Sequence, residues 1–308
     1  MLKTAGIHHI TAMVNDAQRT IVFYASVLGL RLVKKTINFD RPEVYHLYFG
    51  DKAGNPGTVI TFFPWEKQLK GRIGMGQVGV ISFSIPKGSF PYWKNRLETF
   101  DIPYEITNRF GESYIQFKDP DGLVLELVEH ATDGDHAIQG FAGTTLISAQ
   151  PNKTADVLEN MLGFQLVGEE EGYLRFKSSA SIGNIVDIKL LPSVRGLMGA
   201  GTVHHIAWRA SDESELSEWK MLLERNGYHP TEIKDRNYFK AIYFHEGGGI
   251  LFEIATDPPG FTVDEPIEHL GESLQLPSWL EEKRKELEEM LPSVQVRTLK
   301  GENDETYI

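Results

Sequence analysis

The sequence predicts an α+β fold made of four consecutive βαβββ units. Four helical runs, at 17–28, 90–100, 153–162 and 214–226, each follow one strand pattern and precede about three more. The pattern recurs about every sixty residues, which is typical of duplicated units that cannot bury their apolar faces alone. Units two and four also align residue by residue: GMGQVGVISFSI matches GAGTVHHIAWRA, and DGLVLELVE matches GGILFEIAT. Duplication therefore explains the rhythm better than chance.

Each unit has recognisable boundaries. In the first, the strand Ile7 to Val14 precedes Asp16, a helix N-cap residue, and the run AQRTIVFYASVL stops at Gly29 before the strand LRLVKKTINF. In the third, KTADVLENML stops at Gly163 and FQLV follows, as LRLV follows Gly29. The fourth helix, SELSEWKMLLERN, stops at Gly227. The four units are expected at about 5–65, 75–130, 140–193 and 200–257.

These units divide the chain into three parts. Residues 1–135 hold two units, 136–257 hold two more, and 258–308 form a C-terminal extension rich in proline and glycine. The extension contains one predicted helix at about 279–291, with leucines repeating along one stripe. This helix is expected to cover a barrel or to join a subunit interface.

Composition narrows the function. A length of 308 residues suits about two domains, and 41% hydrophobic residues suffice for a sizeable core. The net charge of −12 argues against nucleic acid as a partner. No signal peptide or membrane-spanning run is recognisable, so we expect a cytoplasmic protein without a membrane partner. Because the chain has no cysteine, any metal must be held by His, Asp or Glu.

Two strands carry the same pair of adjacent histidines, in AGIHHITAMV and in TVHHIAWRA. Side chains alternate along a strand, so His9 shares a face with Thr11, whereas His8 lies on the other face. His205 and His204 repeat this arrangement. A single strand histidine is more often a hydrogen-bonded structural residue than a ligand, but two matched pairs indicate a common cause.

IHHITAMVND with FYASVLGLRLV, the DPDGLVLELVE turn and strand, and the four units resemble the glyoxalase/bleomycin-resistance/extradiol-dioxygenase superfamily over residues 5–257. GIHHIT, YHLYFGD, VHHIAWR and PPGFTVDEP are similar to its hydroquinone ring-cleaving, methylhydroquinone-degrading branch. The resemblance implies two open, cup-shaped mixed β-barrels with helices outside. It also implies a divalent metal held by first-strand and last-strand residues, with the second histidine of each pair on the metal side.

The ligand positions can be read through all four units under this resemblance. Only the pairing of unit one with unit four collects two imidazoles and a carboxylate, the set associated with non-haem Fe(II). We therefore predict that unit one closes against unit four and unit two against unit three, with Glu126 structural or on the surface. The first-strand positions are His9, Val80, Thr145 and His205, and the last-strand positions are Thr61, Glu126, Ile188 and Glu253.

Other residues are candidates for a role beside the metal. His8 is a candidate acid–base catalyst, with a backbone-bonded structural histidine as the alternative. The resemblance implies that Arg236 and Tyr243 line the pocket as catalytic residues, and the alternatives are a loop salt bridge and a packed strand tyrosine. Thr11 is expected to bind substrate. His46 belongs to the resemblance, and a structural role is equally compatible with its sequence context.

The resemblance implies an Fe(II)-dependent extradiol-type dioxygenase, with Mn(II) as the alternative metal, that cleaves the ring of a hydroquinone or related phenol with O2. Its partners are thus a small aromatic substrate and O2, in a detoxification or aromatic catabolism setting. Two alternatives share the fold: a glyoxalase-type isomerase or lyase, disfavoured by Thr61 at the fourth ligand position, and a non-catalytic binding protein. The sequence leaves open the particular hydroquinone and the oligomeric state, including a homo-oligomer.

Overall fold

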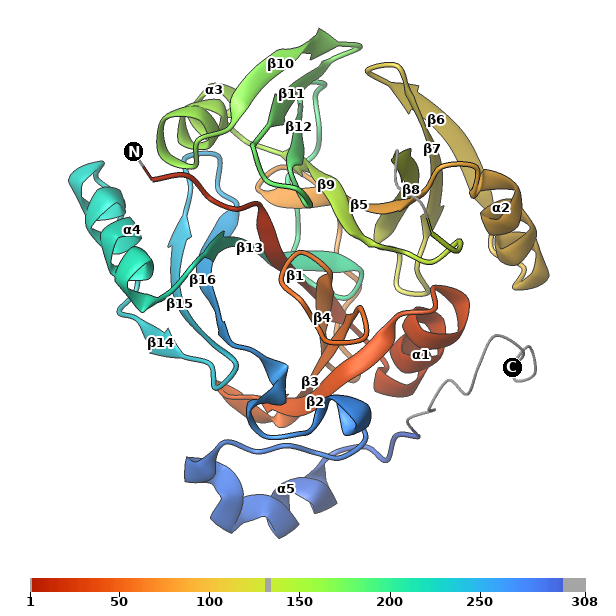
Figure 1. The fold of residues 1–308 in the computed structure, drawn as a ribbon, viewed down its shortest axis with the longest axis vertical. Coiled ribbons are helices and arrows are strands. Elements are labelled where there is room, and N and C mark those ends of the chain that lie inside the picture. The colour runs from red at the N-terminus through yellow and green to blue at the C-terminus, as the bar shows by residue number, and fades with distance from the viewer. Residues whose placement is uncertain (1, 131–133, 296–308) are drawn as a thin grey trace.

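The computed structural model describes residues 2–130 and 134–295, and within them the four predicted units are present (Figure 1). Each unit has one strand, one helix and three strands. The first two units contain β1 (Ile7–Val14), β2 (Arg31–Asn38), β3 (Arg41–Gly50), β4 (Val59–Pro64), β5 (Gln77–Pro86), β6 (Tyr104–Arg109), β7 (Glu112–Lys118) and β8 (Val124–His130). The last two contain β9 (Gly140–Ile147), β10 (Gln165–Glu170), β11 (Tyr173–Lys177), β12 (Ile185–Lys189), β13 (Thr202–Ala210), β14 (Lys234–Asp235), β15 (Phe239–His245) and β16 (Leu251–Pro259).

The helices lie outside the sheets (Figure 1). They are α1 (Ala17–Ile21), α2 (Phe90–Thr99), α3 (Pro151–Asp156) and α4 (Glu213–Arg225), and α1 and α3 continue as π-helical turns over Val22–Val27 and Val157–Met161. The side chain of Asp16 accepts a hydrogen bond from the backbone N–H of Arg19, which confirms it as the N-cap. Gly29 adopts a φ of 70°, the left-handed conformation that a helix-ending glycine supplies without a Cβ penalty.

The strands form two eight-stranded sheets, with the orders β14-β15-β16-β13-β1-β4-β3-β2 and β10-β11-β12-β9-β5-β8-β7-β6. In the first sheet, β1 pairs with β13 antiparallel, so units one and four close together. In the second, β5 pairs with β9, which joins units two and three. The predicted fold of two cup-shaped β-barrels and the predicted pairing of the units are both confirmed, and each sheet takes strands from both halves of the chain.

The ligand positions predicted for unit three were wrong. His205 faces Thr11 across the β1–β13 pair, and the equivalent residue of the second sheet is Gly143, which faces Ser82. The equivalent of Glu253 is Asp187, because Asp187 pairs with Thr145 as Glu253 pairs with Ala207. Thr145 and Ile188 were displaced because a stretch such as IVDIK, without a histidine beside it, does not specify its own register.

Charged side chains are buried inside the second barrel. The Arg109 guanidinium donates to Asp187 Oδ2 over 2.7 Å and to both oxygens of Glu126 over 2.9 and 2.6 Å. Arg175 donates two further hydrogen bonds to Asp187. Since only about 1% of either carboxylate side chain is exposed, Glu126 is a buried structural residue with its charge compensated.

The C-terminal extension crosses the open edge of the first barrel. Lys34 on β2 is fully buried and binds the carboxylates of Asp264 and Glu265. Lys35 forms an isolated bridge with Leu274 further along the extension. The helix predicted at 279–291 is only partly α-helical: Ser278–Lys283 is a 3₁₀ helix without a side-chain cap, and α5 (Arg284–Met290) follows it and contacts β3 (Figure 1).

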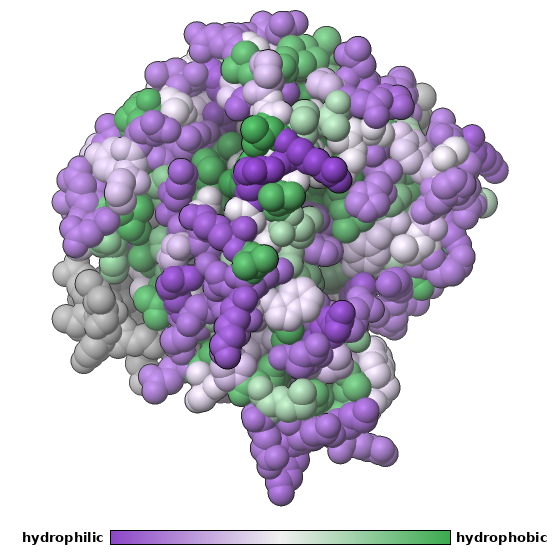
Figure 2. Space-filling model, turned by 180° about the vertical axis from the view of Figure 1, so that it is seen from behind, coloured by the Kyte–Doolittle hydropathy of each residue, from purple (hydrophilic) through white to green (hydrophobic). Residues whose placement is uncertain are grey.

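The surface is largely hydrophilic. On the face turned away from the view of Figure 1, hydrophobic residues occur as small groups among charged and polar ones (Figure 2). Within the described part of the chain, the helices are all too short or too polar to cross a membrane.

Candidate metal centre

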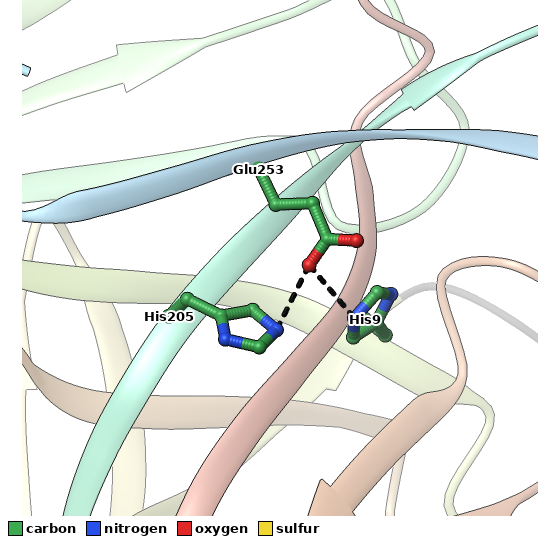
Figure 3. Close-up of side chains that lie close together, drawn as sticks. All are labelled: His9, His205 and Glu253. Carbon is green, nitrogen blue, oxygen red and sulfur yellow. Dashed lines mark ion pairs between the residues drawn. The ribbon is translucent and has the colours of Figure 1, made fainter. Parts of the chain in front are cut away.

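Three side chains from adjacent strands of the first barrel converge. His9 is on β1, His205 on β13 and Glu253 on β16 (Figure 3). Oε2 of Glu253 lies 3.3 Å from Nε2 of His9 and 2.8 Å from Nε2 of His205, and one potential ligand atom of each residue lies within 4.8 Å of the others. The structure thus brings together the three residues predicted as ligands. Among the described residues, no other group of His, Asp and Glu meets this geometric condition.

The chemistry of these donors fits a divalent cation. Burial lowers the pKa of His205, which favours the neutral imidazole that binds metals. Burial alone raises the pKa of Glu253, but the neighbouring imidazoles outweigh it and hold this pKa well below its usual range. Both carboxylate oxygens are buried and make no hydrogen bond to the described residues. A cation between these three donors would satisfy the lone pairs that now face one another.

His8 lies behind His9 and holds it in one tautomer. Nε2 of His8 is 3.1 Å from the carbonyl oxygen of Thr256, which can only accept, so this nitrogen carries the proton. Nδ1 of His8 is then an acceptor for Nδ1–H of His9, 2.9 Å away, and Nε2 of His9 keeps a free lone pair toward Glu253. Burial, with a smaller contribution from His9, lowers the pKa of His8 to about 3. Both ring nitrogens of His8 are therefore engaged, one by the Thr256 carbonyl and the other by His9.

The second histidine pair repeats this contact. Nδ1 of His204 lies 2.8 Å from Nδ1 of His205, which leaves Nε2 of His205 for the centre. Burial, followed by the neighbouring His205, lowers the pKa of His204 to about 3. His204 is only partly buried, in contrast to His8, and its ring packs against Phe63. The first residue of each HH pair thus orients the second.

A chain of hydroxyl and imidazole groups occupies the fourth ligand position. Thr61 Oγ1 lies 2.8 Å from Thr11 Oγ1 and 2.8 Å from Nε2 of His46, while Nδ1 of His46 lies 2.8 Å from the Tyr48 hydroxyl. Tyr48 was not predicted from the sequence as a residue of this site. Its only signal was the spacing of two in YHLYFG, which places His46 and Tyr48 on one face of β3.

Arg236 and Tyr243 lie together at the edge of the centre. Nε of Arg236 donates to the Tyr243 hydroxyl over 3.1 Å, and the Arg236 guanidinium also binds Asp40 at 3.0 Å. The Tyr243 ring centroid is 5.7 Å from that of His205, and Tyr243 pairs with Glu253 across β15 and β16. Burial raises the pKa of Tyr243, so its hydroxyl stays protonated at neutral pH. Both residues are therefore beside the three converging groups, as expected.

The fold and the converging His-His-Glu set are those of a superfamily that binds small molecules at metal centres. The family model described as "Glyoxalase/Bleomycin resistance protein/Dioxygenase superfamily" matches residues 6–127 and 140–264, and the chain belongs to this family.

Several relatives carry dioxygenase names. "Putative ring-cleaving dioxygenase MhqO" of Bacillus subtilis is 54% identical over 96% of this chain and 99% of the relative. "Chlorohydroquinone/hydroquinone 1,2-dioxygenase" of Sphingobium indicum is 33% identical over 92% of this chain and 95% of the relative. A crystal structure of a "putative dioxygenase" from Bacillus subtilis superposes with a TM-score of 0.94 at 54% identity, covering 97% of this chain and all of that one.

Proposed function

We propose that this protein is an Fe(II)-dependent dioxygenase that cleaves the aromatic ring of a hydroquinone or a related phenol. His9, His205 and Glu253 would hold the metal. The observation that carries the proposal is this set of two imidazoles and one carboxylate, buried and otherwise unpartnered, with the non-ligating Thr61 at the fourth position. Such a set leaves coordination positions open for substrate and O2. Because a glyoxalase-type enzyme is expected to need a fourth ligand, the threonine at position 61 also disfavours that alternative.

When bound, the metal supplies a Lewis acid and a redox centre for the reaction between the phenol and dioxygen. The protein supplies orientation and charge. Arg236 is a fixed cation beside the site, and it holds the Tyr243 hydroxyl in place as a hydrogen-bond donor toward a substrate oxygen. Asp40 and Tyr243 together restrict the guanidinium to one orientation.

We assign His8 a different role from the acid–base catalysis expected from the sequence. With Nε2–H bound to the Thr256 carbonyl and Nδ1 bound to His9, it has no free nitrogen for a substrate proton. We propose that His8 is a positioning residue that selects the metal-binding tautomer of His9.

The hydroquinone class of substrate is supported by the relative named chlorohydroquinone/hydroquinone 1,2-dioxygenase, which aligns over nearly the whole chain. The proposal extends to hydroquinones as a class.

The decisive experiment reconstitutes the metal-free protein anaerobically with Fe(II), adds methylhydroquinone, admits oxygen and follows O2 uptake, with Mn(II) in a parallel sample. We expect one O2 consumed per ring, and labelling with oxygen-18 should place both atoms in the product. His205→Ala should abolish uptake, while His269→Ala, a control whose side chain is 65% exposed in the C-terminal extension, should not. No uptake with any hydroquinone, combined with turnover of a thiol hemiacetal with Ni(II) or Zn(II), would establish the glyoxalase alternative instead.

A further inference from the structure

The chain Thr11–Thr61–His46–Tyr48 links three strands to the candidate metal centre. Thr11 is on β1, Thr61 on β4, and His46 and Tyr48 are on β3. Thr11 and Thr61 are fully buried and Tyr48 is 2% exposed, so the hydroxyl hydrogens of this chain need partners within the protein. This requirement determines the direction in which the hydrogen bonds run.

The direction follows from the Tyr48 hydroxyl. Its one hydrogen-bond partner in the described part of the chain is Nδ1 of His46. If Nδ1 carried the proton, the buried hydrogen of Tyr48 would be left without an acceptor, so Tyr48 donates and Nδ1 accepts. His46 then carries its proton on Nε2 and donates it to Thr61. The Thr61 hydroxyl in turn donates to Thr11.

The last hydrogen of the chain belongs to Thr11 and has no acceptor among the described residues. Thr11 lies two residues after His9, on the same face of β1, and faces His205 across the β1–β13 pair. Its O–H group is therefore offered to whatever binds between these histidines.

Comparison with the second barrel shows why residue 61 must carry a hydroxyl group for the hydrogen bonds to run from Tyr48 toward Thr11. Ser82 and Glu126 are the register equivalents of Thr11 and Thr61, and there the Ser82 hydroxyl donates to the Glu126 carboxylate over 2.7 Å. A carboxylate can only accept, so it takes the hydrogen away from the centre. Thr61 both accepts and donates, and it leaves the Thr11 hydrogen free.

We propose that Tyr48, His46 and Thr61 form a one-way hydrogen-bond chain that fixes Thr11 as a donor to the substrate oxygen at the metal centre. The proposal rests on the proposed function for the identity of the substrate. Thr11 touches the substrate, whereas the other three are positioning residues. A hydrogen bond to an oxygen that has lost its proton strengthens binding by about 10- to 100-fold.

The tautomer of His46 tests the chain without any turnover. Protein labelled with nitrogen-15 in its histidines and loaded with diamagnetic Zn(II) should show His46 as the neutral Nε2–H tautomer in long-range proton–nitrogen spectra. Tyr48→Phe, which removes the hydrogen donated to Nδ1, should produce a mixture of tautomers. A wild-type His46 that is protonated on Nδ1, or on both nitrogens, overturns the proposal.

Anaerobic calorimetric titration of the Fe(II)-loaded protein with methylhydroquinone tests the consequence for binding. Thr11→Val, which removes the donor itself, should weaken binding about 10- to 100-fold, and Thr11→Ser, which keeps the hydroxyl, should restore it. His46→Phe and His46→Gln form a second such pair, because glutamine can still donate to Thr61.

The matched control is Thr36→Val. Thr36 is a fully buried threonine that pairs with His46 in the β2–β3 register, but its hydroxyl has no hydrogen-bond partner in the described structure. Its replacement should leave binding unchanged. Wild-type affinity in Thr11→Val, or equal losses in the valine and serine variants, would overturn the proposal. If the wild-type protein binds no hydroquinone, the proposed function fails together with the substrate named here, while the His46 tautomer still reports the direction of the chain.

Discussion

Replacing His8 with leucine is expected to weaken metal binding, whereas the loss of the hydrogen bond to the Thr256 carbonyl lowers the stability of the metal-free and metal-bound forms alike. In the proposed metal-bound form, Nε2 of His9 would give its lone pair to the metal, so the proton of His9 lies on Nδ1, 2.9 Å from Nδ1 of His8. Leucine cannot accept this hydrogen bond, and a buried N–H without a partner costs about 1–3 kcal/mol. In the metal-free form, His9 can carry the proton on Nε2, which lies 3.3 Å from Oε2 of Glu253.

The missing acceptor for the Nδ1–H group of His9 therefore weakens metal binding. A penalty of about 1–3 kcal/mol corresponds to a dissociation constant raised by roughly 5- to 150-fold. This agrees with the roughly 10- to 100-fold typical of residues that orient metal-binding histidines.

Competition titration of Mn(II) or Zn(II) against a chromophoric chelator measures this constant, and thermal unfolding of the metal-free protein measures stability. His8→Asn is the matched variant, because its carbonyl oxygen can accept from His9, and it should recover most of the affinity. His204→Leu should cost less, since His204 is only partly buried and water can replace its acceptor. The reasoning is refuted if His8→Leu binds metal as tightly as wild type, or if the asparagine variant binds as weakly as the leucine variant.

Three further changes test other parts of the structure. Arg109→Met leaves the buried carboxylate of Glu126 without a counter-charge, while Asp187 keeps Arg175, and should cost about 3–5 kcal/mol in urea unfolding. The control Lys220→Met, which removes a surface ion pair, should cost less than about 1 kcal/mol, and equal losses would contradict this account. Lys34→Met should speed amide hydrogen exchange in residues 261–276, because it removes the buried cation that binds the extension, and unchanged protection would count against it. Tyr243→Phe should lower kcat/KM about 100-fold at unchanged metal content, and full activity would exclude Tyr243 as a donor.

The fold and the three converging residues could be predicted because their signals are local. Strand–helix–strand order repeats in every unit, a glycine ends the helix in units one, three and four, and the HH pairs mark equivalent strands. Counting ligand positions then predicted that unit one joins unit four, although β1 and β13 are almost 200 residues apart in sequence. This inference worked because a metal requires several donors at one point, and one pairing alone supplied them.

The remaining features depend on contacts that no local pattern encodes. The role of His8 is decided by the carbonyl of Thr256, 248 residues away. The register of unit three was misread although Asp187 marks the carboxylate position in IVDIK, because its first strand, GFAGTTLI, has no histidine to align with the HH pairs. The connection of Tyr48 to the site depends on the pairing of β3 with β4, which places its partner His46 against Thr61.

The same strand register supports a candidate metal centre in the first barrel and a buried network of structural ion pairs in the second. In the first, the last strands of the two units bring Thr61 and Glu253 to the interior, and among the described residues the ion-pair partners of Glu253 are two histidines rather than an arginine or a lysine. In the second, the equivalent residues Glu126 and Asp187 are both acidic, and Arg109 bridges them. A guanidinium compensates buried carboxylates permanently and leaves no open ligand position, so these charged residues of the second barrel have a structural role. In the first barrel the partners of the carboxylate are two imidazoles, which can themselves act as ligands, so the three groups together offer donors to a cation.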